Sequence, residues 1–147
     1  MRKSFLALVS FVPFAALACP NLSGQFSCND FDNGAVQDVT ISQSDTGGVT
    51  TYHVKIVSDG KTIERDHVAD GAVKSTSNDE FTTRTEKSYC DGNALKMDIN
   101  GVKKANGDQL NATVTINLDA AGNMYDNYIG KEGNKTLNFE ETCKRVK

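Results

Sequence analysis

The sequence predicts an all-β protein built as an antiparallel meander of eight to ten short strands. Runs of alternating apolar and polar residues recur along the chain after residue 18. They are separated by Asp59-Gly60, Asp70-Gly71, Asp91-Gly92 and Asn106-Gly107, pairs that suit tight turns between antiparallel strands. No segment after residue 18 shows the 3.6-residue apolar period of a helix. We expect the meander to close into a barrel, with a two-sheet sandwich as the alternative.

The first 18 residues have the pattern of a signal peptide. Two basic residues precede an apolar stretch from Phe5 to Ala18, which is shorter than the about 20 residues that a membrane-spanning helix needs. The stretch ends in the small-residue pattern Ala16-Leu17-Ala18 that signal peptidases recognise. We therefore expect residues 1–18 to be removed and residues 19–147 to form one periplasmic or secreted domain. A lipid anchor on Cys19 is the alternative.

The composition after residue 18 favours a small core supported by disulfides. Leu, Ile, Val and Phe together are 25 of 129 residues, close to the lower limit for a self-supporting fold. The 14 basic and 19 acidic residues form no basic cluster, so no nucleic-acid partner is indicated. Four cysteines in an exported chain predict two disulfides. Cys19–Cys28 with Cys90–Cys143 is the favoured pairing, and the other two pairings remain open.

The hairpin around Asn106-Gly107 is the best-defined element. If these two residues form the loop, one face of the hairpin is apolar and the other polar. The apolar pairs are then Leu95–Leu118, Met97–Ile116, Ile99–Val114 and Gly101–Ala112. In this register, Gly101 lies within a strand, where a glycine is typical of a bend or bulge.

A second hairpin is predicted around Asp59-Gly60. Lys55 then faces Glu64 and His53 faces Asp66, and such opposite charges favour the register by about 0.2–1 kcal/mol for each pair. The other face pairs Ile56 with Ile63, Val54 with Arg65 and Tyr52 with His67. This face is predicted to point into the barrel.

The remaining strands are shorter. The residues that share a face are Leu22, Gly24, Phe26 and Cys28; Val39 and Ile41; and Leu137, Phe139 and Cys143. Residues 72–90 form either one long bent strand or two short ones.

The first strand carries a family resemblance. Gly24-Gln25-Phe26, followed by an antiparallel meander, resembles the opening of the lipocalin (calycin) superfamily, with Phe26 where that family usually has Trp. The segment from Cys19 to Cys28 is also similar to the openings of small exported bacterial proteins. The first resemblance implies a barrel that holds a small ligand in its interior.

Arg65 is the strongest candidate for a binding residue. A guanidinium on an inward face needs a partner, and a bound carboxylate or phosphate would supply one in bidentate geometry. The alternatives are a position at the rim, or an internal pair with Glu86 or Glu141. The residues predicted to line the ligand site are Tyr52, Val54, Arg65, His67, Met97 and Ile116.

Other chemistries have weaker support in the sequence. His53 opposite Asp66 lies on the solvent face with no serine placed beside it, so a nucleophilic triad is not predicted. The segment from Asp30 to Gly34 departs from EF-hand spacing at Ala35 and is interpreted as a turn. Residues 119–126 are interpreted in the same way. No metal site or cofactor is predicted.

The sequence therefore favours an exported, non-enzymatic barrel that binds a small molecule, which Arg65 suggests is anionic. The alternative is a protein-binding envelope factor, such as a hydrolase inhibitor, that acts through loops 119–123 or 130–134. The first reading requires an internal cavity of about 300 Å³ or more, whereas the second requires a filled interior.

Overall fold

The computed structural model describes residues 19–29, 34–76 and 79–146. The expected signal peptide and residues 30–33 lie outside this part of the chain. The described residues form ten strands, which are β1 (Gly24–Asn29), β2 (Val36–Thr46), β3 (Val49–Ser58), β4 (Lys61–Val68), β5 (Val73–Ser75), β6 (Phe81–Asp91), β7 (Ala94–Lys103), β8 (Gln109–Leu118), β9 (Met124–Glu132) and β10 (Lys135–Arg145). The same residues contain no helix that is long and apolar enough to cross a membrane.

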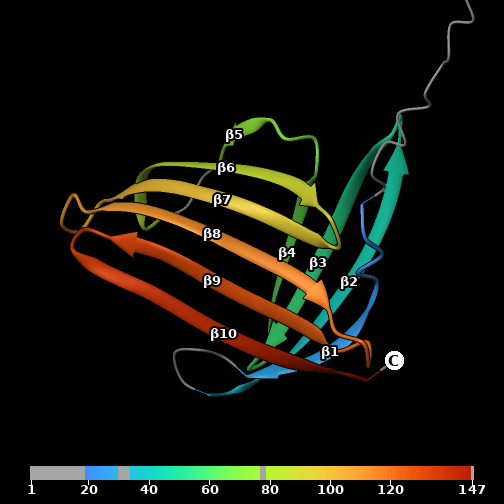
Figure 1. Ribbon diagram of the computed structural model, residues 1–147. Coiled ribbons are helices and arrows are strands. Elements are labelled where there is room, and N and C mark those ends of the chain that lie inside the picture. The colour runs from blue at the N-terminus through green and yellow to red at the C-terminus, as the bar shows by residue number, and fades with distance from the viewer. Residues whose placement is uncertain (1–18, 30–33, 77–78, 147) are drawn as a thin grey trace, which may run out of the picture.

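The strands form one antiparallel sheet in the order β4-β3-β2-β1-β10-β9-β8-β7-β6-β5. Every neighbouring pair is consecutive in the chain except β1 and β10, which bring the two ends of the domain together. Figure 1 shows the sheet curling into a barrel-like shape, with β1–β4 forming one wall and β5–β10 the other. The predicted all-β meander is confirmed, and the residues 72–90 form two strands.

The barrel has a seam where the two ends of the sheet approach each other. β4 and β5 lie at the ends of the strand order, so the ladder does not continue around the whole ring. Across this seam, the Gly71 amide donates to the Ser88 carbonyl at 2.9 Å, and the His67 side chain reaches Glu86. These bonds link the connection after β4, and β4 itself, to β6.

The hairpin around Asp59-Gly60 has the predicted register. Val54 pairs with Arg65, Tyr52 with His67 and Lys55 with Glu64. Asp59 and Gly60 have φ values of 50° and 74°, as a two-residue loop of the primed type requires. The register therefore places Arg65 and His67 on the inward face.

The hairpin between β7 and β8 differs from the predicted register by two residues. Met97 pairs with Val114 and not with Ile116, because the loop contains four residues and not two. The Lys103 amide donates to the Asp108 carbonyl, and the Gly107 amide donates to the Lys103 carbonyl. A shift of two residues leaves every side chain on its predicted face.

A bulge does occur near Gly101, although it lies in the partner strand. The register of β6 shifts between Phe81 and Thr83, opposite the end of β7. A Cβ atom on Gly101 would lie 2.7 Å from the Phe81 ring. Glycine is therefore needed there to admit the ring.

The favoured disulfide pairing is wrong. The bonds join Cys19 to Cys90 and Cys28 to Cys143. Cys28 follows two residues of β1 that pair with Lys144 and Arg145 of β10, so Cys143 is its cross-strand neighbour, with a Cα–Cα distance of 4.4 Å. Because Cys19 is bonded to Cys90, its sulfur is not free to carry a lipid, as the anchored alternative would require.

The largest fully buried side chains lie outside the cavity of the barrel. Leu22, Phe26, Tyr52, Leu95 and Cys143 are the largest side chains with almost no exposed surface. The Tyr52 hydroxyl donates to the Pro20 carbonyl at 2.7 Å. Burial, with a smaller effect from the Asp45 charge, raises the pKa of Tyr52 to about 12, so this hydroxyl remains a donor. One part of the interior is filled, which leaves the rest of it to form the cavity.

Candidate functional site

The candidate site is a cavity of about 620 Å³ inside the barrel. Its volume lies within the range of about 300–1,000 Å³ that is usual for small-molecule sites. Aliphatic and aromatic side chains form most of its wall; these are Val39, Ile41, Val54, Ile56, Phe81, Met97, Ile99, Leu110, Val114, Ile116, Met124, Tyr128, Leu137 and Phe139. They come from both walls of the barrel, because alternate residues of each strand point inward.

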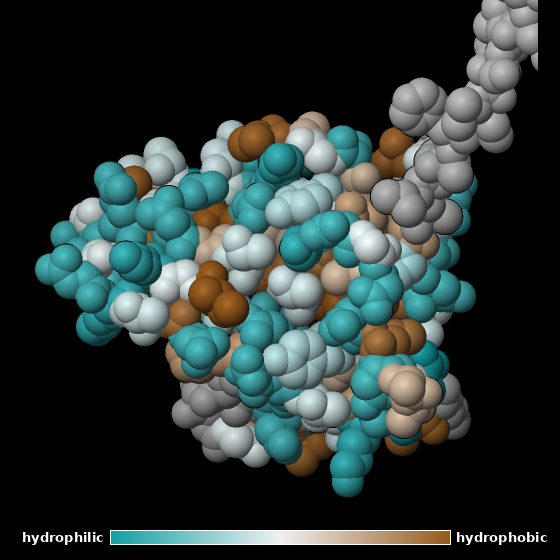
Figure 2. All heavy atoms as spheres, viewed as in Figure 1, coloured by the Kyte–Doolittle hydropathy of each residue, from teal (hydrophilic) through white to brown (hydrophobic). Residues whose placement is uncertain are grey.

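The open side of the cavity exposes part of this apolar wall. Phe139 is 42% exposed although it lines the cavity, and its ring lies 6.0 Å from that of Tyr128. Ile63, which pairs with the cavity residue Ile56, is 47% exposed. Figure 2 shows that the outer face in view is mainly hydrophilic, with hydrophobic residues in small separate groups. On this face the hydrophobic groups are small and separate, whereas the cavity wall is largely apolar.

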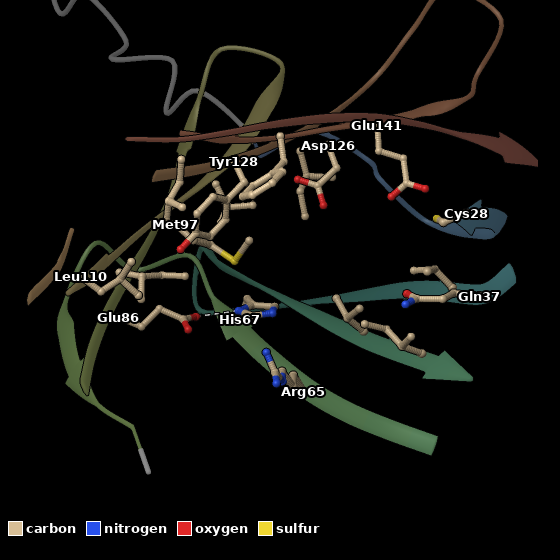
Figure 3. Close-up of a pocket in the computed structure, with 18 of the residues that line it drawn as sticks. Cys28, Gln37, Arg65, His67, Glu86, Met97, Leu110, Asp126, Tyr128 and Glu141 are labelled. Carbon is tan, nitrogen blue, oxygen red and sulfur yellow. Dashed lines mark hydrogen bonds and ion pairs between the residues drawn. The ribbon is translucent and has the colours of Figure 1, made fainter. Parts of the chain in front are cut away.

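A buried charge network lies at the seam. His67 Nδ1 is 2.7 Å from Glu86 Oε1, and both side chains are nearly buried. Arg84 Nη2 is 3.4 Å from the second oxygen of Glu86, and the Ser88 hydroxyl donates to the first. The hydrogen bond from His67 lowers the pKa of Glu86, and the Arg84 charge acts in the same direction. Glu86 is thus an anion that holds β4 against β6 (Figure 3).

Arg65 lines the cavity without a partner among the described residues. It does not pair with Glu86, which is engaged by His67 and Arg84. Figure 3 shows Arg65 on β4, on the wall that faces Asp126 and Glu141. As a residue it is exposed, so it lies where the cavity meets solvent. Its guanidinium is available to an anionic group that enters from outside.

Two carboxylates point into the cavity from the opposite wall. Asp126 on β9 pairs directly with Glu141 on β10, and both line the cavity (Figure 3). The Asn29 amide donates a hydrogen bond to Glu141. Asp126 Oδ1 is buried and accepts no hydrogen bond. Burial and, to a smaller extent, the Glu141 charge raise the pKa of Asp126 to about 6.

The surroundings of this carboxylate pair offer few further ligands to a metal ion. Glu141 lies near the sulfurs of Cys28 and Cys143, but these are joined in a disulfide and cannot act as thiolate ligands. Two carboxylates also supply fewer oxygens than the six to eight that Ca²⁺ takes. Farther along the wall, Lys103 and Glu132 pair at 2.7 Å and neutralise each other.

Five of the six residues predicted for the ligand site line the cavity. Val54, Arg65, His67, Met97 and Ile116 do so. Tyr52 points inward as expected, but it packs in the filled part of the interior and not against the cavity. Whether the five bind a ligand remains a prediction.

Asp126 is the residue that the sequence interpretation missed. The turn predicted for residues 119–126 is present in its first part, where the Asp119 carboxylate accepts hydrogen bonds from the amides of Ala121 and Asn123. However, β9 begins at Met124. The signal that could have revealed Asp126 is the alternation of Met124, Asp126 and Tyr128, in which an acid occupies an inward position.

A serine contact that the sequence did not predict lies on the outer face of the barrel. His53 Nδ1 is 2.7 Å from Asp66 Oδ1, as the hairpin predicted, and His53 Nε2 is 3.1 Å from the Ser44 hydroxyl. The order resembles a nucleophile, base and orienting acid. These side chains point away from the cavity, and those of His53 and Asp66 are 44% and 64% exposed. Water competes for such hydrogen bonds, and the outer face of the sheet gives an acyl group no enclosed site.

Comparison with known proteins identifies the fold. No family model and no curated protein matches the sequence. A mutant of the fatty acid transporter REP1-NXSQ matches the structure with a TM-score of 0.58 at 16% identity, covering 85% of this chain and 98% of that one. Secretory abundant heat soluble protein 4 from Ramazzottius varieornatus matches with a TM-score of 0.58 at 14% identity, covering 86% and 95%. A further such protein from the same organism matches with 0.56 at 13%, covering 88% and 98%. The chain therefore has the calycin-like β-barrel fold that these proteins share.

Proposed function

We propose that this protein is an exported, non-enzymatic barrel that binds one small amphipathic molecule in its cavity. The cavity of about 620 Å³ carries the proposal, because a barrel used only as a scaffold for its loops would be expected to have a filled interior. The alternative of a loop-based inhibitor is less well supported for that reason. The two disulfides fit an oxidising, exported location.

Arg65 and the apolar wall support a ligand with an apolar body and an anionic group. The wall offers aliphatic surface from both sides of the barrel, and each buried CH₂ group of a ligand would contribute about 0.8 kcal/mol. The fold is shared with a protein described as a fatty acid transporter, whose ligand belongs to this chemical class. Arg65 would hold the anionic group at the open side.

A displacement assay tests both parts of the proposal. The neutral dye N-phenyl-1-naphthylamine should fluoresce when it enters the cavity, and octanoate should displace it. Arg65→Ala should weaken octanoate binding about tenfold, since a partly exposed charge-assisted bond contributes about 1.4 kcal/mol. Lys55→Ala is the matched control, because it removes a positive charge from the outer face. Equal octanoate affinity in the two variants would exclude the role of Arg65, and absence of dye binding would exclude a functional cavity.

Native mass spectrometry of the exported protein gives an independent test. An intact mass that begins at Cys19 would support removal of residues 1–18. A co-purified small molecule that leaves on unfolding would support the binding function, whereas a mass that includes residues 1–18 would contradict export by this route.

A further inference from the structure

The carboxylate wall formed by Asp126 and Glu141 has no function in a site for a simple anionic amphiphile. An anion in the cavity is attracted by Arg65 but repelled by this wall, which faces it across the cavity (Figure 3). The two acids are direct cross-strand neighbours, and like charges in that position destabilise a sheet. An arrangement that costs stability in the empty protein calls for a separate explanation.

Asp126 is the more unusual member of the pair. Its Oδ1 atom is buried and accepts no hydrogen bond from the described residues, and an unsatisfied buried acceptor costs about 1–3 kcal/mol. Its strand neighbour on β8 is the apolar Ile116, which offers no hydrogen-bond donor. The other charged groups that line the cavity are Arg65, the cluster of His67, Arg84 and Glu86, the pair of Lys103 with Glu132, and Glu80. None of them forms an ion pair with Asp126 in the described structure.

We propose that the Asp126–Glu141 wall receives a protonated amine of the bound molecule. The proposal rests on the binding function proposed above and narrows its ligand to an amphipathic molecule that carries a cationic nitrogen. An ammonium group supplies up to three donors and a positive charge, which bind the Asp126 carboxylate where it lines the cavity and offset the repulsion between the two acids. Arg65 remains available for an acid group elsewhere on the same ligand, so the cavity suits a molecule that bears both charges.

Competing occupants of the wall fit less well. A soft metal ion lacks thiolate ligands, because the nearby sulfurs form a disulfide, and a hard divalent ion would find only the two carboxylates. An anion would face two negative charges. A hydroxyl group could donate one hydrogen bond to Asp126 but would leave the repulsion in place. An ammonium group provides both the donors and the charge.

The test compares three probes of one chain length, octylamine, octanol and octanoate, each displacing N-phenyl-1-naphthylamine at about pH 8, where Asp126 is ionised. Octylamine should bind the wild-type protein at least about tenfold more tightly than octanol, as a charge-assisted hydrogen bond implies. Asp126→Asn should remove this preference and leave the affinity for octanol unchanged. Circular dichroism of each variant verifies that the fold is intact.

Glu140→Gln is the matched control. Glu140 precedes Glu141 on β10, points outward and accepts a hydrogen bond from Asn127, so the substitution removes one negative charge outside the cavity. This variant should keep the wild-type preference for octylamine. If it loses the preference as Asp126→Asn does, the attraction arises from the net charge of the protein and the inference is wrong.

The outcomes separate this inference from the proposed function. Octylamine that binds no more tightly than octanol, while the dye and octanoate bind normally, overturns the amine site and leaves the cavity function in place. Failure of the dye and of all three probes to bind overturns the proposed function itself. Retention of the amine preference in Asp126→Asn assigns it to another part of the cavity and also overturns the inference.

Discussion

Replacing Asp126 with asparagine should stabilise the fold at neutral pH, although it removes a charge from the proposed binding site. Burial raises the pKa of this carboxyl from its ordinary value of 3.8 to about 6. The folded protein therefore holds a proton that the unfolded chain has already released at intermediate pH. Between these two values the wild-type protein loses stability as the pH rises, and above about pH 6 the loss is constant.

The size of the effect follows from the difference between the two pKa values. Each pKa unit corresponds to about 1.36 kcal/mol, so a shift of about two units gives an upper limit of about 3 kcal/mol. The asparagine keeps one oxygen without a hydrogen-bond donor, and the side chain lies at a cavity that admits water. We therefore expect Asp126→Asn to be more stable than the wild type by about 1–3 kcal/mol at about pH 8 and nearly equal to it at about pH 4.

Urea unfolding followed by circular dichroism at about pH 4, 6 and 8 measures this difference. Glu141 is the acid beside Asp126, and its charge contributes to the same shift. Glu140→Gln is the control, since its outward side chain should change stability by less than about 0.5 kcal/mol at every pH. A difference between Asp126→Asn and the wild type that does not change with pH would refute the reasoning.

Two further predictions concern the disulfides and the seam. The double variant Cys28→Ser/Cys143→Ser, which lacks the Cys28–Cys143 bond, should be less stable in urea unfolding by about 4–5 kcal/mol, because the bond closes a loop with a sequence separation of 115 residues. A peptide map of the non-reduced protein that joins Cys19 to Cys28 would contradict the pairing. Glu86→Gln should destabilise the fold by about 2–4 kcal/mol at pH 7 because it removes the carboxylate that pairs with Arg84 and His67. The pKa of Glu86 is lowered in the folded state. The stabilisation by Glu86 is therefore present above its ordinary pKa and is lost as the pH falls through its lowered folded-state pKa. A stability difference between Glu86→Gln and the wild type that is equal at acidic and neutral pH would contradict this assignment.

The sequence predicted the site best where a turn of known length set the strand register. The two-residue loop at Asp59-Gly60 allows only one register between β3 and β4. This register places Arg65 and His67 on the inward face. At the β7–β8 hairpin, the loop contains two more residues than expected, and the partners of Met97 changed. The faces did not change, because side chains alternate with a period of two.

Features that depend on distant parts of the chain were less accessible. The pairing of β1 with β10 brings Cys28 beside Cys143, and no local pattern distinguishes this closure from a bond to Cys19. Asp126 was missed for a different reason. Its polarity suggested a turn, whereas the backbone hydrogen bonds of β8 and β10 hold it within β9 and turn it inward.

The cost of burying Asp126 and the proposed amine site make a joint prediction. A ligand that binds only the folded state adds about 2.7 kcal/mol of stability at a free concentration of 100 times its Kd, and about 1.4 kcal/mol at 10 times. If Asp126→Asn weakens the binding of octylamine tenfold, an octylamine concentration that stabilises the wild type by about 2.7 kcal/mol should stabilise the variant by about 1.4 kcal/mol. Octanol should stabilise both proteins equally, because it carries no charge for the carboxylate to attract. As the pH falls below about 6, Asp126 becomes protonated and the advantage of the wild type with octylamine should diminish. A wild-type advantage that persisted at about pH 4 would show that the amine is held by a group other than this carboxylate.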